Sequence, residues 1–509
     1  MNPYIGIVKG KPGWIQIFEQ EGLSYKTFQP PDNPAVLVVD DITSRNAILE
    51  YLAEGGHIIT STEIVGKLLG EHMQDVKIDY IVPDASEVFH NSGIIDVYER
   101  GHVRKKEGFG TTDNDFPAVF TFQYRKGHGI CFPFDVSALL LKNVSQMKYF
   151  YAKQGRFPAE YVCSVSKGEV RKLAINSIRY LFRKKGIHYI HKWYYPDGKD
   201  NAFTFRVDTD DSGFAEITNT FKIAEKNSLS FTFFVEVKCL QNALHKLKDL
   251  KNQEIAVHCF EHRIFRKTEK NQENFLRARQ LLHKTGITTT GIAVPYGLWD
   301  NSLGALIESS GFAYSTEFSY AYDDFPTHPC VNTKHSPVLQ IPVHPICTGT
   351  LLYAKNNISE IKQYFTDIIN EKCVSGESLF LYGHSREISR YPSILQHIIN
   401  EITTRKNIWA GTYGDFYKWW KEREQTKLEI TSERNLLKIK TKETNSHLHL
   451  HIITAEGKHA LIPLQSEIDL NKITFSQMPQ PEPFDRKRLS IKQGSLKLKF
   501  KEIENWIKR

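Results

Sequence analysis

Three acidic residues follow directly on an apolar run near the middle of the chain. The segment 203–207 predicts a strand, and it runs into Asp208, Asp210 and Asp211 before a turn at Ser212. Carboxylates crowded at one strand end repel one another unless a cation lies among them. Acidic residues at a strand end also serve as turn residues and helix N-caps, so this stretch alone leaves both interpretations open.

Two histidines four residues apart follow a second predicted strand, 254–257. His258 and His262 would share a face if they lie on one helical turn. Two imidazoles and one carboxylate match a catalytic zinc site, which keeps positions open for water and substrate. Such a metal makes a water molecule nucleophilic near neutral pH, while a spare carboxylate takes its proton and another histidine protonates the leaving group. These residue types favour a metal-dependent hydrolase.

The elements that must position these residues alternate between strand and helix over residues 201–425. Short apolar runs predict strands, and the segments between them have helical spacing, including one over 243–250. Repeated units of this length favour a distorted (β/α) barrel, in which reactive residues gather at the carboxyl ends of the strands. Asp208, His258 and His384 all follow or end predicted strands.

Five short motifs between about Ala202 and Trp420 resemble, in the same order, those of the polysaccharide deacetylases of the NodB-homology type, carbohydrate esterase family 4. The matching segments are RVDTDD at 206–211, EIAVHCFEH at 254–262, AVPYG at 293–297, GFAYS at 311–315 and LYGH at 381–384. Each motif is weak alone, and their order along the chain is the stronger signal.

The resemblance implies a role for each matched residue. Asp208 would be the catalytic base and His384 the catalytic acid. Asp210, His258 and His262 would hold a divalent metal ion, which in this family is usually Zn2+. Tyr296 would contribute its amide N–H to an oxyanion hole, and Trp299 would line a sugar subsite or pack in the core.

Three positions leave alternatives open. Asp211 competes with Asp210 as the metal ligand, although residues two apart on an extended chain share a side and favour Asp210 together with Asp208. His344 also ends a predicted strand and competes with His384. The family's third motif usually opens with an arginine that pairs with the base; here that position is Ala293, and Arg206 is the candidate substitute.

Residues 1–145 predict a separate α/β domain with a parallel sheet, because buried strands alternate with helices. Its strand order and its GHGICFPFD ending loosely resemble glutamine-amidotransferase-like domains. Cys131 lacks the Gly-x-Cys-x-Gly elbow that would present a nucleophile, so we expect this domain to be non-catalytic. Residues 146–200 are expected to form a helical connecting region.

Residues 426–509 change to period-two alternation at 436–441, 447–452 and 496–500, which predicts a small antiparallel, sandwich-like β accessory domain. His447, His449 and His451 share one side of such a strand. A solvated strand face is the favoured interpretation there, and metal binding is the alternative.

Composition limits the remaining possibilities. The net charge of +8 over 509 residues is mild, and we expect no nucleic-acid partner. No stretch approaches about 18 uninterrupted apolar residues, so no membrane span is expected. Seven scattered cysteines without a Cys-x-x-Cys pair, and a start without a signal pattern, indicate reduced thiols in the cytoplasm.

The sequence therefore predicts an α/β multidomain hydrolase that removes N-acetyl or O-acetyl groups from a carbohydrate. Two alternatives remain. One is a non-catalytic carbohydrate-binding protein with a degenerate barrel, and the other is an amidohydrolase that acts on a non-sugar amide. The glycan and the oligomeric state are not predicted.

Overall fold

The computed structural model describes residues 3–104, 107–442, 445–480 and 483–492. Its contacts divide the chain into two compact units, each built from three segments. The first unit comprises Met1–Lys142, Val165–Gly198 and Trp420–Phe484, and the second comprises Asn143–Ser164, Lys199–Trp419 and Asp485–Arg509. The expected strand at 496–500 lies outside the described residues. The predicted α/β multidomain fold class is confirmed, whereas the four predicted sequence domains stay a prediction.

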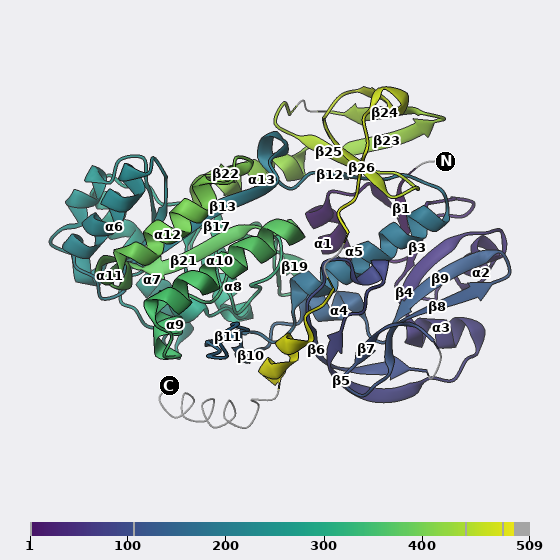
Figure 1. The fold of residues 1–509 in the computed structure, drawn as a ribbon, viewed down its shortest axis with the longest axis horizontal. Coiled ribbons are helices and arrows are strands. Elements are labelled where there is room, and N and C mark those ends of the chain that lie inside the picture. The colour runs from purple at the N-terminus through teal and green to yellow at the C-terminus, as the bar shows by residue number, and fades with distance from the viewer. Residues whose placement is uncertain (1–2, 105–106, 443–444, 481–482, 493–509) are drawn as a thin grey trace. The chain divides into compact units, whose positions relative to one another are not determined.

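A nine-stranded sheet forms the largest part of the first unit (Figure 1). It runs in the order β2 (Tyr25–Thr27), β1 (Ile5–Ile7), β3 (Val36–Val39), β4 (His57–Ser61), β9 (Gly127–Phe132), β8 (Pro117–Tyr124), β7 (Phe109–Thr112), β5 (Gln74–Val82) and β6 (Ile95–Val103). The pairs from β2 to β9 are parallel, and those from β9 to β6 are antiparallel. The predicted parallel arrangement therefore holds for one half of this sheet.

Five helices belong to the same unit: α1 (Pro12–Glu21), α2 (Arg45–Ala53), α3 (Thr62–Leu69), α4 (Val136–Leu141) and α5 (Lys167–Lys184). Helix α5 contacts β3, β4 and β9. Two smaller antiparallel sheets complete the unit. One contains β12 (Tyr189–Lys192), β25 (His449–Ile453), β26 (Lys458–Pro463) and β28 (Ser476–Gln477), and the other β23 (Leu428–Glu433), β24 (Leu436–Thr441) and β27 (Glu467–Asp469).

The second unit contains a curled, entirely parallel sheet that positions the site. Its order is β20 (Leu339–Gln340), β17 (Tyr314–Ser315), β16 (Gly291–Ile292), β15 (Glu254–Cys259), β14 (Thr232–Glu236), β13 (Asn201–Asp208) and β21 (Leu379–His384), with β22 (Ile408–Ala410) also pairing with β13. Beyond β20 the chain continues to His344, whose amide donates to the carbonyl of Phe380 in β21. This bond joins the two ends of the sheet into a distorted barrel.

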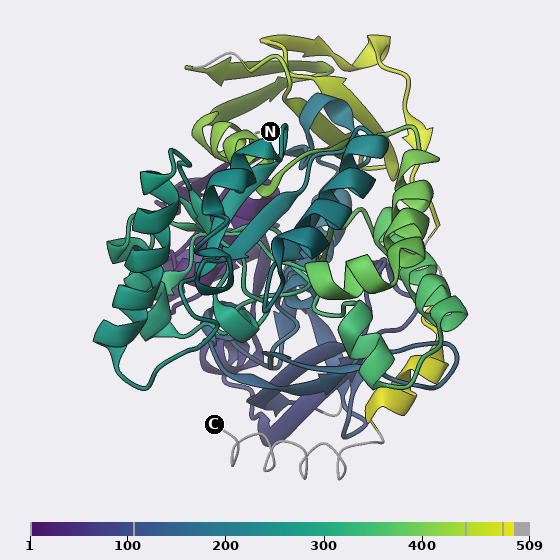
Figure 2. The same cartoon turned by 90° about the vertical axis from the view of Figure 1, so that its left-hand side faces the viewer.

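Helices flank this sheet, as Figure 2 shows in teal and green. They are α6 (Phe214–Lys226), α7 (Thr268–Lys284), α8 (Asn301–Ser309), α9 (Thr348–Tyr353), α10 (Ile358–Ser375), α11 (Ser385–Arg390), α12 (Pro392–Thr403) and α13 (Tyr413–Gln425), the last of which runs across the boundary between the units. Apolar side chains of the strands and helices form one buried core, to which Phe205, Val207 and Val257 contribute. No helix in the described part of the chain is long and apolar enough to cross a membrane.

Two predicted details change in this unit. The helix expected over 243–250 is a 3-10 helix, Leu244–Asp249, in which the buried Leu244 and Leu247 lie three residues apart, as the three-residue turn of that helix requires. Part of the expected connecting region forms an antiparallel hairpin of β10 (Ser145–Tyr149) and β11 (Ala159–Cys163), which belongs to the second unit.

Candidate metal centre and active site

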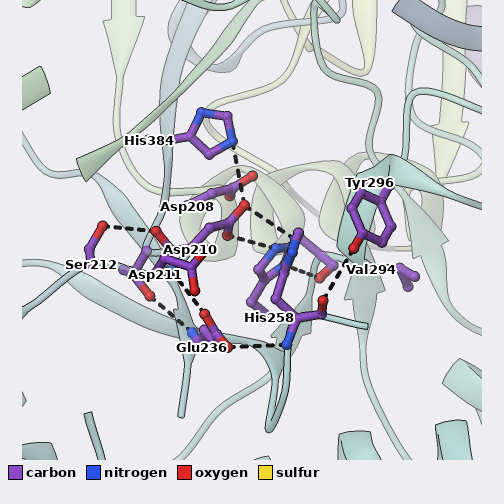
Figure 3. A network of polar contacts seen from close by, with 12 residues as sticks. Asp208, Asp210, Asp211, Ser212, Glu236, His258, Val294, Tyr296 and His384 are labelled. Carbon is purple, nitrogen blue, oxygen red and sulfur yellow. Dashed lines mark hydrogen bonds and ion pairs between the residues drawn. The ribbon is translucent and has the colours of Figure 1, made fainter. Parts of the chain in front are cut away.

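Three of the predicted site residues converge at the carboxyl ends of β13 and β15. The Nε2 atom of His258 lies 3.0 Å from Oδ1 of Asp210, and Nε2 of His262 lies 3.2 Å from Oδ2 of the same carboxylate. One ligand atom from each side chain lies within 4.8 Å of the other two. Figure 3 shows the carboxylate of Asp210 facing the imidazole of His258. Atoms bound to one cation at 2.0–2.2 Å lie roughly 3 Å apart, so these spacings fit a shared metal ion.

The hydrogen bonds within the group also fit a cation. Nδ1 of His258 donates to the carbonyl oxygen of Ala293 at 2.5 Å, which leaves the lone pair of Nε2 directed toward Asp210. Although Nε2 and Oδ1 of Asp210 are close, they lack hydrogen-bond geometry, and both atoms are buried without a hydrogen-bond partner among the described residues. Two buried atoms with lone pairs facing each other are stabilised by a positive ion between them.

The electrostatics of the group favour a positive charge next to the carboxylate of Asp210. Burial opposes ionisation of Asp210, but the neighbouring imidazoles of His258, His384 and His262 outweigh it and lower the pKa of the carboxyl group. Burial likewise works against protonation of His258, but Asp210 raises the pKa of that imidazole. The arrangement therefore holds a carboxylate in place for ligation.

Asp208 lies beside this group and is paired with Arg206. The guanidinium donates from Nε to Oδ1 and from Nη2 to Oδ2 of Asp208, both at 2.7 Å, and from Nη1 to the carbonyl of Thr316. Both side chains are buried, at 1% and 2% exposure for Arg206 and Asp208. Arg206, which the sequence offered as the partner of the base, thus reaches the carboxylate of Asp208 from the same strand.

His384 ends strand β21 on another side of Asp210. Its Nε2 lies 3.5 Å from Oδ2 of Asp210, and its Nδ1 lies 3.9 Å from Sγ of Cys347 and 3.8 Å from Oε2 of Glu387. Burial acts against protonation, but the contact with Cys347 and the nearby carboxylates of Asp210 and Asp208 raise the pKa of His384 to about 10. A protonated imidazole whose Nε2 faces the group is suited to donating a proton.

A cavity of about 480 Å3 surrounds these residues. Tyr296 lines it, is 53% exposed and adopts a left-handed φ of 62°. Its hydroxyl donates to the carbonyl of His262 at 3.3 Å. Trp299, the other predicted substrate contact, is instead buried, packs edge-on against Tyr320 with ring centroids 4.7 Å apart, and is not among the residues that line the cavity.

Neither of the two competing residues, Asp211 and His344, belongs to the group formed by Asp210, His258 and His262. The carboxylate of Asp211 lies with Glu236 and Cys239, whereas that of Asp210 lies with the two histidines. His344 is buried, its Nε2 lies 3.0 Å from the hydroxyl of Tyr364, and burial lowers the pKa of its imidazole to about 3. It does not line the cavity, whereas His384 does.

Several residues that line the cavity were not predicted from the sequence. Cys347 follows a predicted strand and Glu387 stands three residues after His384, so their positions gave a weak signal. Most of the others come from the β10–β11 hairpin, from α9 and from α11; they include Met147, Glu160, Tyr161, Tyr353 and Arg386. The hairpin residues carried no signal, because sequence spacing does not show that the segment folds against the barrel.

Cys131 of the first unit has the environment of a structural thiol. It is fully buried, its Sγ lies 3.7 Å from the carbonyl oxygen of Phe120, and burial raises the pKa of the thiol to about 12. A thiol in this state is inert as a nucleophile.

Comparisons with known proteins give no family for the chain. No family model matches it, and no curated protein matches it. Among solved structures, a putative polysaccharide deacetylase from Mycobacterium smegmatis shares 15% identity over 48% of this chain and 98% of its own, with a TM-score of 0.40. The Puue allantoinase shares 16% identity over 45% and 93% of the two chains, with a TM-score of 0.40.

A CE4 family pseudoenzyme from Bacillus anthracis is also similar, with 10% identity over 44% of this chain and 66% of its own, and a TM-score of 0.30. Similarities at this level decide neither fold nor function, which rest here on the geometry of the chain itself.

Proposed function

We propose that this protein is a metal-dependent deacetylase that hydrolyses N-acetyl or O-acetyl groups of a carbohydrate. The observation that carries the proposal is the grouping in one cavity of an Asp–His–His set, a second carboxylate paired with an arginine, and a third imidazole. A hydrolase of this type requires a metal site, a base and an acid within reach of one reacting carbon.

Asp210, His258 and His262 would hold a divalent cation, which we propose to be Zn2+ because two imidazoles and a carboxylate suit that ion. Such an ion, when bound, lowers the pKa of a water molecule and polarises an acyl carbonyl group. Asp210 and His262 lie just beyond the ends of β13 and β15, and His258 lies in β15; these two strands both pair with β14, so the barrel brings the three residues to one edge of the sheet.

The proton transfers fall to Asp208 and His384. Asp208 accepts the proton of the attacking water, while Arg206 holds both of its oxygens in a fixed orientation. Nε2 of His384 donates a proton to the departing amine or alcohol. The amide N–H of Tyr296 would stabilise the negative charge that develops on the acyl oxygen.

A carbohydrate substrate is supported by the aromatic rim of the cavity. Tyr296 and Tyr353 are 53% and 71% exposed, and they are among the few large apolar side chains exposed in the described part of the chain. Both line the cavity. Exposed aromatic rings offer flat apolar faces with a polar edge, which suits stacking against sugar rings.

The test combines metal analysis with acetate release from a panel of N-acetylated and O-acetylated oligosaccharides. We expect about one bound divalent ion per chain, and acetate release that falls by at least about 100-fold in Asp208→Asn while the metal is retained. Asp210→Ala should lose both the metal and the activity. Asp249→Asn, at an exposed position that does not line the cavity, serves as the matched control. A chain that binds no metal, or an Asp208→Asn variant as active as the wild type, would overturn the proposal.

A further inference from the structure

Strand β14 lies between the two strands that carry the proposed metal ligands, yet it contributes no ligand itself. It pairs in parallel with β13 on one side and β15 on the other. Its last residue is Glu236, which stands opposite Cys259 after a register shift between Val235 and Glu236. The irregularity places this residue between the two loops that leave β13 and β15.

The carboxylate of Glu236 is bonded to both loops. Its Oε2 accepts the backbone N–H of Asp211 at 3.0 Å, and its Oε1 accepts the backbone N–H of His262 at 3.1 Å. Its own backbone N–H donates to Oγ1 of Thr209 at 2.9 Å. The side chain is only 3% exposed. Figure 3 shows the carboxylate of Glu236 beside Asp211.

Each bond fixes backbone next to a proposed ligand. Asp211 adopts a left-handed φ of 48°, which residues other than glycine rarely do, and the bond to its N–H holds the turn in which Asp210 projects toward the histidines. His262 lies beyond the end of β15 and outside any helix or strand, so its backbone is not held by the sheet. The bond to Oε1 fixes its N–H, while the Tyr296 hydroxyl donates to its carbonyl and Asn274 is bonded to the backbone of Glu261 and Arg263 on either side.

We propose that Glu236 is a positioning residue that sets the separation between Asp210 and His262 and thereby the affinity of the site for its divalent cation. The inference rests on the proposed metal site but not on the identity of the substrate. A metal site tolerates displacements of only about 0.5 Å in its ligands. A residue that is hydrogen-bonded to both loops therefore controls whether the ligands on the two loops can bind one ion at the correct distances.

A carboxylate is required because both of its oxygens accept hydrogen bonds. In Glu236→Gln one oxygen is replaced by an NH2 group, which would face a backbone N–H and repel it. One loop therefore loses its anchor while the size and shape of the side chain are kept. Glu236→Asp keeps both acceptors but is one methylene shorter, so it cannot reach both loops in the same backbone arrangement.

The test measures metal binding directly, by titrating the metal-free full chain with Zn2+ against a chromophoric chelator and by recording the visible spectrum of the Co2+ form. We expect Glu236→Gln and Glu236→Asp to bind Zn2+ about 10- to 100-fold more weakly than the wild type, with an altered Co2+ spectrum. Glu225→Gln, an exposed glutamate on α6, should match the wild type in both measurements.

Two results would overturn the inference. The first is wild-type affinity and spectrum in a folded Glu236→Gln or Glu236→Asp chain, even where its thermal stability falls. The second is two Zn2+ ions per wild-type chain of which the Glu236 variants lose only one, because Asp211, Glu236 and Cys239 would then form a second site. A wild type that binds Zn2+ with the expected dependence on Glu236 but releases no acetate would contradict the proposed activity and leave this inference intact.

Discussion

At the scale of single residues, Arg206 supplies the positive charge that faces the carboxylate of Asp208, since the segment AVPYG at 293–297 contains no arginine. Residues two apart on a strand point to the same side of the sheet, so the guanidinium can fold over the carboxylate that follows it. Both of its bonds to Asp208 measure 2.7 Å, and the pair is buried. The carbonyl of Ala293 accepts the hydrogen bond from Nδ1 that orients His258.

Arg206→Met should therefore destabilise the protein strongly. The substitution leaves the carboxylate of Asp208 buried without its counter-charge, which costs about 3–5 kcal/mol for such pairs. The loss in the free energy of unfolding is measured by titrating the protein with urea and using hydrogen exchange in β13 to report on the second unit. The double variant Arg206→Met/Asp208→Asn should recover most of it without recovering acetate release. Equal instability of the double and single variants would show that the guanidinium stabilises through packing alone.

At the scale of elements, the sequence predicted the strands of the barrel and placed the reactive residues at their carboxyl ends, because apolar runs and βα alternation are local patterns. It could not predict the left-handed residues Asp211 and Tyr296, since loop conformation depends on partners such as Glu236 that lie on other strands. The ligand and proton-transfer roles of the predicted site residues stay predictions.

The helix α9 carries the most exposed aromatic side chain of the cavity, Tyr353, at its last residue. If this ring stacks on a sugar unit, Tyr353→Ala should raise KM for an acetylated oligosaccharide several-fold, because stacking on an aromatic ring contributes roughly 1 kcal/mol to the free energy of binding. The value of kcat should change little, since the proposed mechanism assigns the proton transfers to Asp208 and His384 and gives Tyr353 no part in them. Steady-state kinetics measures both constants.

The matched control for this experiment is Val374→Ala on α10, an exposed apolar position that does not line the cavity. It should leave both constants unchanged. The stacking role would be excluded if Tyr353→Ala had the same KM as the wild type for acetylated oligosaccharides of every length.

At the scale of the whole molecule, the chain leaves and re-enters each compact unit, a feature that motifs read along a contiguous sequence do not reveal. Within the first unit, strand β12 comes from the expected connecting region and pairs with β25 from the expected C-terminal domain. The interpretation of 447–451 as a solvated face is wrong for His451, which is buried and lies opposite His191 of β12.

That pairing brings three histidines into one hydrogen-bonded chain, of which His191 and His451 are buried and His459 is half-buried. Nδ1 of His191 faces the carbonyls of Glu21 and Lys192, at 3.2 and 3.1 Å, so it must donate and leave Nε2 as an acceptor. His451 then donates from Nδ1 to that Nε2 at 3.0 Å and accepts at its own Nε2 from Nδ1 of His459, also at 3.0 Å. This arrangement is satisfied only while the imidazoles are neutral.

The first unit should consequently lose stability as the pH falls below about 6.5. Burial lowers the pKa of His191 to about 4, although Glu21 opposes this and Arg179 and Arg423 reinforce it, and burial lowers the pKa of His451 well below its usual value. Between the unfolded pKa of 6.5 and the folded value, the unfolded chain binds protons that the folded unit does not, so the free energy of unfolding decreases. For His191 alone the loss reaches about 2 kcal/mol by pH 5.

Hydrogen exchange in β12 and β25 between pH 7.5 and 5, corrected for the intrinsic exchange rate, tests this expectation, because it reports on the first unit separately from the barrel. His191→Gln cannot be protonated, so its protection in these strands should depend less on pH than that of the wild type. Glu21 has its pKa lowered to about 2 by His191, Arg179 and Arg171 in spite of its burial, and this adds a further loss only below pH 4.5. Protection that is constant between pH 7.5 and 5 in the wild type would mean that the buried imidazoles accept protons without opening the sheet.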